Sequence, residues 1–355
     1  MDAQNFITYD QEVIMKQKYW IDNDVLDRSF MLGKTWEDHQ SIGQAAIEKD
    51  WWVTVTLKAL FQTECAKHLL FKGGTSLSKG WHLIERFSED IDLAISHHFF
   101  GIDKSNKSQR DKLRKLSRFY IHNTLSAQLD EKLKAMGICG YRIENVTTVQ
   151  RKDGTTVPID SDKDPTVVLV RYDSLLDHQI NYIPSQVKIE ISCLSMDEPV
   201  ETRRISSLIR ESFPEDDSGA ECIIKAVVPA RTFLEKIFLL AEEFQKDNPR
   251  SIRMSRHLYD LERLMDTEYG HAALADLSLY KAIVEHRQAY YALKYVDYAK
   301  LNPSVISILP PEHVIDEWRK DYANMQRYFI YGQSLPFDDL MRRIRDLQDR
   351  LRAIG

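Results

Sequence analysis

The 355-residue sequence has no apolar run of the roughly 18–20 residues that a membrane span needs, so we expect no membrane helix. Its first residues lack a basic segment followed by an apolar one, which predicts no signal peptide and a cytoplasmic location. The four cysteines, Cys65, Cys139, Cys193 and Cys222, lie far apart and form no Cys-x-x-Cys pair. This spacing argues against a zinc site or a disulfide framework and fits a reducing compartment.

Composition and charge leave several classes of protein open. Hydrophobic residues make up 43% of the chain and aromatic residues 10%, which is enough to build packed cores in one large domain or two ordinary ones. The net charge of −6 gives no hint of nucleic-acid binding. Two local runs, 104–115 and 249–256, are basic nevertheless. Each run is read either as a solvated helix surface or as a local binding face.

The hydrophobic patterns predict an α+β fold that changes character near residue 228. Helices are expected over 40–66, 75–85 and 108–136, and strands over 69–72, 91–95, 141–150, 166–172, 186–192 and 221–228. After Pro229, which suits the first turn of a helix, helical spacing appears over 230–246, 254–268, 271–289, 312–331 and 337–353. We therefore divide the chain into an N-terminal extension (1–40), a mixed α/β domain (41–228) and a helical domain (229–355).

The stretch FKGGTSLSK, followed by SEDIDLAI, combines a glycine turn with two carboxylates. In a strand, Asp90 and Asp92 project from the same face, where they repel each other unless a cation lies between them. Mg²⁺ takes carboxylate and phosphate oxygens as ligands. Gly73 and Gly74 let backbone N–H groups approach a phosphate, and Thr75 and Ser76 add hydroxyl donors. The spacing predicts a phosphate cradle beside a metal-binding edge, as phosphoryl or nucleotidyl transfer requires.

A third acid should complete this site. In VKIEIS, alternation places Glu190 on the polar face of a strand, which makes it the best candidate. Each feature also has an ordinary structural explanation, since a Gly-Gly pair is usually a turn and an Asp-x-Asp triplet is usually a strand edge or a loop. The order and spacing of all the features together are more specific than any one of them.

At this point the sequence resembles a known family. The motifs GGTSLSK, RFSEDIDL, VKIEIS, PARTFLEKIFLL and RMSRHLYDLERL resemble those of the AbiEii/AbiGii-type nucleotidyltransferase toxins of type IV toxin–antitoxin systems. The resemblance covers roughly residues 45–345. It implies a polymerase-β-like nucleotidyltransferase domain with a mixed β-sheet, and a helical domain that closes the nucleotide cleft. It also implies an NTP substrate, Mg²⁺ at a two-metal site where Mn²⁺ could substitute, and a cognate antitoxin encoded nearby.

The resemblance also assigns residues outside the opening motif. It implies that Lys236 reaches the nucleotide phosphates and that Asp260 is an active-site acid, either a general base or a group that orients Lys236. The alternatives are a surface lysine and an Arg256–Asp260 surface pair. His257 stands where relatives often have an aspartate, so its role stays open. Lys79, one turn after the glycines, is assigned either to the phosphates or to the surface.

The function implied by the resemblance is transfer of NMP from an NTP to RNA, especially the 3′ end of tRNA, which blocks translation. Lys112 and Arg114 in the first basic run, and Arg253 and Arg256 in the second, are then candidate contacts for RNA phosphates. Two alternatives stay open. The acceptor could be a small molecule or a protein side chain, or the chain could bind nucleotides as an interaction module without turnover. No membrane partner is expected.

Overall fold

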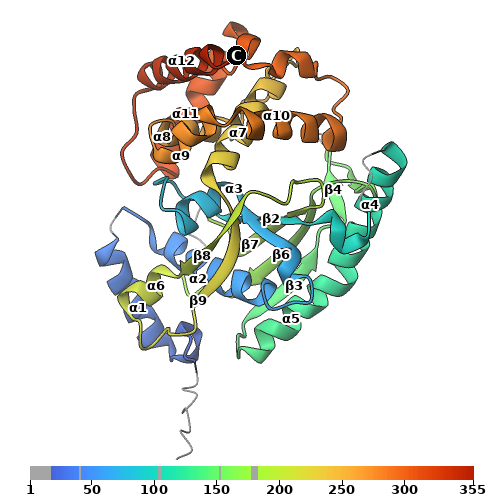
Figure 1. Ribbon diagram of the computed structural model, residues 1–355. Coiled ribbons are helices and arrows are strands. Elements are labelled where there is room, and N and C mark those ends of the chain that lie inside the picture. Colours follow the sequence, from blue (N-terminus) through green and yellow to red (C-terminus); the bar gives the residue numbers. More distant parts are fainter. Residues whose placement is uncertain (1–16, 40, 103–105, 152, 177–182) are drawn as a thin grey trace, which may run out of the picture.

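The computed structural model describes residues 17–39, 41–102, 106–151, 153–176 and 183–355. Figure 1 shows two halves, with a β-sheet and its helices below and a group of helices above. All described strands lie between residues 69 and 227, and from Pro229 onward helices and short helical turns predominate. The predicted α+β class, with a mixed sheet followed by a helical half, is confirmed. In the described part of the chain, no helix is long and apolar enough to cross a membrane.

The main sheet has seven strands in the order β3-β6-β7-β2-β1-β9-β8. In chain order these are β1 (Leu69–Lys72), β2 (Asp90–Ile95), β3 (Tyr141–Asn145), β6 (Thr166–Tyr172), β7 (Gln186–Ser192), β8 (Val200–Ser206) and β9 (Glu221–Val227). β2 runs parallel to β7 and antiparallel to β1, so the sheet is mixed at its centre. A separate two-stranded sheet pairs β4 (Thr148–Gln150) with β5 (Thr156–Pro158).

Helices cover the sheet and share one hydrophobic core with it. They are α1 (Val25–Asp38), α2 (Gln44–Leu60), α4 (Lys107–Tyr120), the π-helical turn η5 (Ile121–Leu125), α5 (Ser126–Ala135) and α6 (Leu208–Ser212). α2 is buried along almost its whole length, on all of its faces. Trp20, which precedes α1, is fully buried in this core and donates its backbone N–H to Asp217 at 2.8 Å.

The helical half has a second core of its own. It contains α7 (Pro229–Glu243), α8 (Ser255–Leu264), α9 (Glu268–Ala275), α10 (Leu277–His286), the π-helical turn η6 (Arg287–Tyr291), α11 (Ile315–Tyr328) and α12 (Phe337–Ala353), with short 3₁₀ turns at Tyr298–Leu301, Pro303–Val305 and Glu312–Val314. The single helix expected over 271–289 is wrong. Asp276 ends α9 and accepts a hydrogen bond from the N–H of Leu279, so it caps a new helix.

The helix expected over 75–85 is also wrong. The chain forms only the short α3 (Gly73–Thr75) and the π-helical turn η3 (Ser76–Gly80), and then leaves the helix at Trp81. His82 follows with a φ of +53°, which a helix does not allow. The strand expected over 141–150 divides into β3 and β4, and the pattern gave no sign of β5 or of the edge strand β8.

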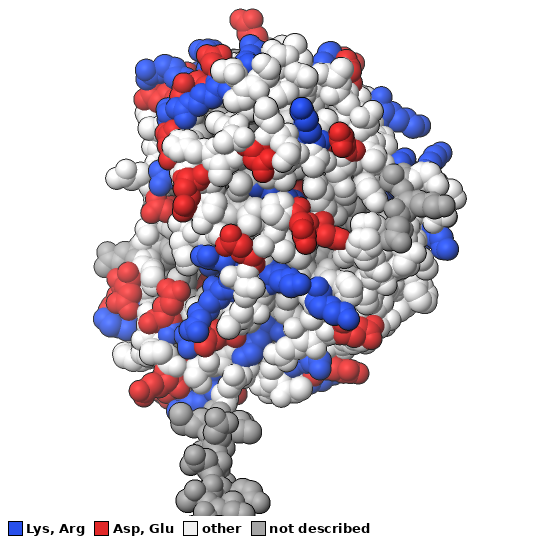
Figure 2. Space-filling model, viewed as in Figure 1, with Lys and Arg blue, Asp and Glu red and all other residues white. Residues whose placement is uncertain are grey.

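Figure 2 shows positive and negative side chains interspersed over one face of the molecule, in keeping with the modest net charge.

Candidate active site

Two central strands bring the three predicted acids together. β2 carries Asp90 and Asp92, and β7 carries Glu190. The parallel register sets Asp92 beside Glu190 and Asp90 beside Lys188. On its other side, Asp92 is paired with Lys72, the last residue of β1. Because in-register neighbours project from the same face of a sheet, the acids and both lysines share one face.

Burial and mutual repulsion set the protonation of these carboxylates. Burial, reinforced by the charge of Glu190, raises the pKa of Asp92 to about 6. Burial also raises the pKa of Asp90. Lys188 forms an ion pair with Glu190 and so balances only part of the negative charge. Burial and neighbouring negative charge disfavour ionisation of Asp90 and Asp92, and a hard divalent cation such as Mg²⁺ bound between them would offset this cost.

The glycine turn lies directly against the acids. Gly73 has a φ of +77°, and a Cβ built on it would lie 2.1 Å from Oδ2 of Asp92. A Cβ on Gly74 would lie 2.5 Å from Nη2 of Arg86. Thr75 ties the turn to β2, since its hydroxyl donates to the backbone carbonyl of Asp90 at 2.5 Å. Glycine at these positions lets the Asp92 and Arg86 side chains pack against the turn, and both glycines also belong to the lining of the large cleft described below.

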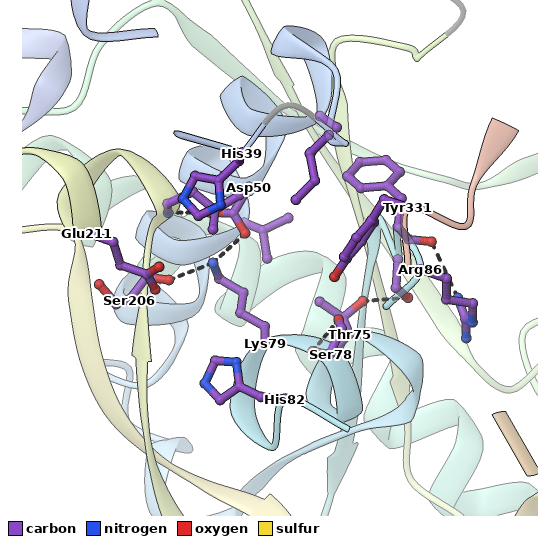
Figure 3. A pocket seen from close by; sticks show the side chains of 16 residues that line it. His39, Asp50, Thr75, Ser78, Lys79, His82, Arg86, Ser206, Glu211 and Tyr331 are labelled. Carbon is purple, nitrogen blue, oxygen red and sulfur yellow. Dashed lines mark hydrogen bonds and ion pairs between the residues drawn. The ribbon is translucent and has the colours of Figure 1, made fainter. Parts of the chain in front are cut away.

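Ser76 and Lys79, both predicted to contact phosphate, lie away from the acids of β2 and β7. Ser76 is buried, and its hydroxyl has no hydrogen-bond partner within the described residues. Lys79 points into a second cavity of about 260 Å³ behind the turn, shown in Figure 3. There its Nζ bonds Oδ1 of Asp50 at 2.5 Å and the carbonyl of Ser206 at 2.7 Å. The structure thus brings Thr75 near the acids but not Lys79.

A buried charge network joins the sheet half of the molecule to the helical half. Asp260 on α8 is fully buried and accepts two hydrogen bonds from Arg86, from Nε at 2.7 Å and from Nη2 at 2.8 Å. Lys236 on α7 lies 2.8 Å from Oδ2 of the same carboxylate. Arg86 belongs to the segment that leads into β2. One carboxylate therefore holds a cation from each half.

The pKa values follow from this network. Burial alone would raise the pKa of Asp260, but Arg86 and Lys236 hold it well below its usual range. Burial lowers the pKa of Lys236, against the attraction of Asp260. Burial, with Lys236 and Arg256 nearby, also holds the pKa of His257 well below its usual value, so this imidazole is neutral at pH 7.

These groups line a cleft of about 600 Å³ between the sheet and the helical half. Its lining contains eight Lys and Arg side chains against four Asp and Glu. Five of the cations also form ion pairs with acids behind the lining: Arg86 and Lys236 with Asp260, Arg250 with Glu243, Arg253 with Glu89 and Arg287 with Glu242. Arg253 and Arg256, both predicted from the sequence to contact RNA, belong to this lining. Nε of Arg256 is buried and has no hydrogen-bond partner in the part of the chain that the structure describes.

A smaller cavity of about 350 Å³ adjoins the cleft. The two share Lys72, Asp92, Glu190, Pro165 and Tyr291, so Asp92 and Glu190 lie at the boundary between them, whereas Asp90 lines only the larger one. Arg114 lines the smaller cavity, whereas Lys112 lies on the outer side of α4. Of the two α4 residues predicted to contact RNA, only Arg114 is near the acids.

The sequence reasoning did not single out several side chains in this lining. Lys72 and Lys188 flank the acids in the sheet, and Tyr291 spans both cavities. A signal for Lys188 was present, because it stands at the same alternating position as Glu190 in a mostly apolar strand, whereas Lys72 ends a strand that contains no acid. Tyr291 had no such signal, since it comes from a helical turn far along the chain.

Comparisons with known proteins agree with the motifs. A search of curated proteins finds no match. Among solved structures, MenT4, the nucleotidyltransferase toxin Rv2826c from Mycobacterium tuberculosis H37Rv, is similar to this chain with a TM-score of 0.42 and 16% sequence identity, over 91% of this chain and 98% of MenT4. The family model for the nucleotidyl transferase AbiEii toxin of type IV toxin–antitoxin systems matches residues 56–343. The chain therefore belongs to the AbiEii family of nucleotidyltransferase toxins.

Proposed function

We propose that this nucleotidyltransferase moves NMP from an NTP to an RNA 3′ end, with tRNA as the favoured acceptor, and so blocks translation. The observation that carries the proposal is the in-register placement of Asp92 beside Glu190, with the Gly73 turn against Asp92. Triphosphate and metal-binding groups are then adjacent, as the transfer of an α-phosphoryl group needs. Catalysis is mainly positioning and neutralisation of charge.

Asp90, Asp92 and Glu190 would hold Mg²⁺, at a two-metal site in which Mn²⁺ could substitute. The donor set supports this, because it offers only carboxylate oxygens and the pKa of Asp92 is raised to about 6. When bound, the ions supply polarisation of the phosphoryl oxygens and charge neutralisation. The protein's own contribution is to fix the two strands in register, so that all three acids project from one face of the sheet.

We assign the triphosphate to the larger cavity. Gly73 and Gly74 contribute the backbone of the turn to its lining, and Lys236 and Arg256 supply positive charge from the facing helices. The unpartnered Nε of Arg256 is a buried donor that a phosphate oxygen would satisfy. This placement favours contact of Arg253 and Arg256 with the nucleotide over the RNA backbone. We propose that the helical half, from residue 229 on, closes over the bound nucleotide.

We propose that Asp260 orients Lys236 and does not act as a general base. Its carboxylate accepts hydrogen bonds from two cations, and its pKa is held well below the usual range, which makes it a poor proton acceptor. The shared carboxylate instead fixes the ammonium group of Lys236 at the cleft wall. His257 is neutral there and is not an acid at pH 7.

The acceptor end is assigned to the smaller cavity. In-line displacement requires the attacking hydroxyl and the departing pyrophosphate to lie on opposite sides of the α-phosphorus. The acids separate the two cavities, so a triphosphate in the larger one leaves the smaller one for the acceptor. Arg114 and Lys163 can contact its phosphates, and Tyr291 offers a ring against which a terminal base can stack.

The decisive experiment incubates the purified chain with total tRNA, Mg²⁺ and each α-³²P-labelled NTP in turn, beside the Asp92→Ala variant. We expect label on tRNA from one NTP, and none with the variant. Label on a protein or a small molecule, with none on RNA, would replace the acceptor class. Tight binding of Mg²⁺-NTP without any product, unchanged in Asp92→Ala, would favour a non-catalytic nucleotide-binding module.

The acceptor assignment has its own matched test on one helix. Arg114→Ala should raise the KM for RNA while leaving the KM for NTP unchanged, because Arg114 lines only the smaller cavity. Lys112→Ala removes an equal charge two residues away on the outer side of α4 and should have a smaller effect. Equal effects of the two variants would contradict the assignment and indicate a diffuse electrostatic contribution.

The family implies an antitoxin partner, and we place the chain in the cytoplasm, where NTP and tRNA are found. We propose that the antitoxin acts without tight binding to this chain. Co-purification of the two co-expressed proteins as a stable complex would contradict this.

A further inference from the structure

Two adjacent histidines and an aspartate form a compact cluster apart from the nucleotide site. His97 and His98 lie on the 3₁₀ turn η4 (His97–Phe100), directly after β2, and Asp197 lies between β7 and β8. Nδ1 of His97 is 3.9 Å from Oδ2 of Asp197, and Nε2 of His98 is 3.7 Å from the same oxygen. The three potential ligand atoms all lie within 4.8 Å of one another.

The groups around the cluster are arranged as supports for metal ligands. Ser96 donates its hydroxyl to Oδ2 of Asp197 at 2.8 Å. Nε2 of His97, the ring nitrogen that faces away from Asp197, lies 3.4 Å from the hydroxyl of Tyr290. Histidines that bind metals usually bond their second ring nitrogen in this way, which fixes the ring. Oδ1 of Asp197, the oxygen that the two histidine distances do not involve, is buried and has no hydrogen-bond partner among the residues described.

We propose that His97, His98 and Asp197 bind a borderline divalent transition metal of the Zn²⁺ class. Two imidazoles and one carboxylate suit Zn²⁺ and not Mg²⁺, which prefers oxygen ligands. Around tetrahedral Zn²⁺ with bonds of about 2.1 Å, ligand atoms are separated by about 3.4 Å. The observed separations from Asp197 exceed this by a few tenths of an ångström, which side-chain rotation can remove. The wide cysteine spacing, which argues against a zinc site, bears only on thiolate ligands, and this site uses none.

The position of the cluster suggests what the metal does. η4 continues from the strand that carries Asp90 and Asp92, and Asp197 follows the strand that carries Glu190. Tyr290 belongs to η6 in the helical half, one residue before Tyr291, which lines both cavities of the nucleotide site. A metal at the cluster would therefore fasten the ends of the two acid-bearing strands to each other and, through Tyr290, to the helical half. The metal is structural in this assignment and takes no part in the transfer.

The test measures Zn²⁺ binding by isothermal titration calorimetry at pH 7.5 after removal of metals, with Co²⁺ as a spectroscopic probe in parallel. Wild type is compared with His98→Ala, Tyr290→Phe, Asp92→Ala and His271→Ala. His98 is largely exposed, so its replacement leaves the fold intact. His271 is an exposed histidine on α9 and serves as the matched control. Saturating Mg²⁺ in the buffer keeps Zn²⁺ out of the proposed metal site at Asp90, Asp92 and Glu190.

We expect one Zn²⁺ per chain in wild type, Asp92→Ala and His271→Ala, and no binding at this site in His98→Ala. Tyr290→Phe should weaken binding by about 10-fold, since it removes only a supporting hydrogen bond. Zn²⁺ should raise the Tm of wild type and not that of His98→Ala. The proposal fails if wild type binds no Zn²⁺ at micromolar concentrations, if His98→Ala binds as tightly as wild type, or if binding is lost in Asp92→Ala. None of these outcomes depends on the acceptor of the transfer reaction.

Discussion

Replacing Asp92 by Asn should stabilise the metal-free protein while it abolishes transfer. In the folded state, burial and the neighbouring Glu190 raise the pKa of Asp92 to about 6. In the unfolded chain an aspartate titrates near 3.9, and a pKa difference of about two corresponds to roughly 3 kcal/mol of folding free energy at pH 7 and above. Asn has the same shape and carries no charge, so it removes this penalty.

The pH window follows from the sign of the shift. A folded-state pKa raised above the unfolded value means that the folded protein binds more protons between pH ~4 and ~6, and stability falls as pH rises through this window. The gain from Asp92→Asn should therefore be small at pH 4, partial at pH 5 and complete above pH ~7. Lys72 opposes the shift, and the pKa of about 6 already includes its effect.

Urea unfolding in EDTA, followed by far-UV circular dichroism, measures the gain at pH 4, 5 and 8. The matched control is Asp349→Asn, an exposed carboxylate on α12, which should change stability by no more than about 0.5 kcal/mol. Adding Mg²⁺ should stabilise wild type more than Asp92→Asn, because a ligand of the ion is lost. The reasoning is refuted if Asp92→Asn is less stable than wild type at pH 8, or if its gain is equal at pH 4 and pH 8.

Three further changes probe the cleft. Asp260→Asn leaves two buried cations without their anion and should lower the free energy of unfolding by about 3–5 kcal/mol. The control Asp266→Asn removes an exposed carboxylate and should lower it by at most ~1 kcal/mol, and urea unfolding midpoints measure both. Lys236→Ala should lower kcat about 100-fold. It should lower the free energy of unfolding by only about 1–3 kcal/mol, because Asp260 keeps its ion pair with Arg86. A larger loss of stability in Lys236→Ala than in Asp260→Asn would contradict this reasoning. Gly73→Ala forces a Cβ against Asp92 and should lower kcat about 100-fold in single-turnover assays, whereas Gly33→Ala, with open space around it, should leave kcat unchanged.

Strand alternation explains why part of the site could be predicted from the sequence. Asp90 and Asp92 are two residues apart, so a strand assignment alone places them on one face. Glu190 is a hundred residues away, but its alternation with apolar neighbours in VKIEIS also assigns it a face. The register that sets Asp92 beside Glu190 is a product of tertiary pairing, and the pattern of neither strand contains it.

Local sequence predicts the wrong structure where the backbone departs from regular helical geometry. The stretch from Thr75 to Glu85 has helical spacing, yet it ends after one π-helical turn and continues through His82 with a positive φ. The same geometry turns Lys79 away from the acids and toward Asp50, where Figure 3 shows it. A prediction based on a continuing helix therefore had no means of placing Lys79.

The charge network shows why the cleft itself was beyond sequence reasoning, and also why it suits a metal-bound nucleotide. Arg86 from the sheet half and Lys236 from the helical half share the single carboxylate of Asp260, which leaves one uncompensated positive charge where the two halves meet, and Arg256 on the helical side adds another. The facing sheet has the opposite imbalance, because its acids are only partly offset by Lys72 and Lys188. A ligand that carries cations on one side and phosphates on the other would balance both walls at once. An Mg²⁺-bound triphosphate has this arrangement, whereas a free anion would satisfy only the helical wall, so nucleotide affinity should depend on the metal as strongly as on the cationic side chains.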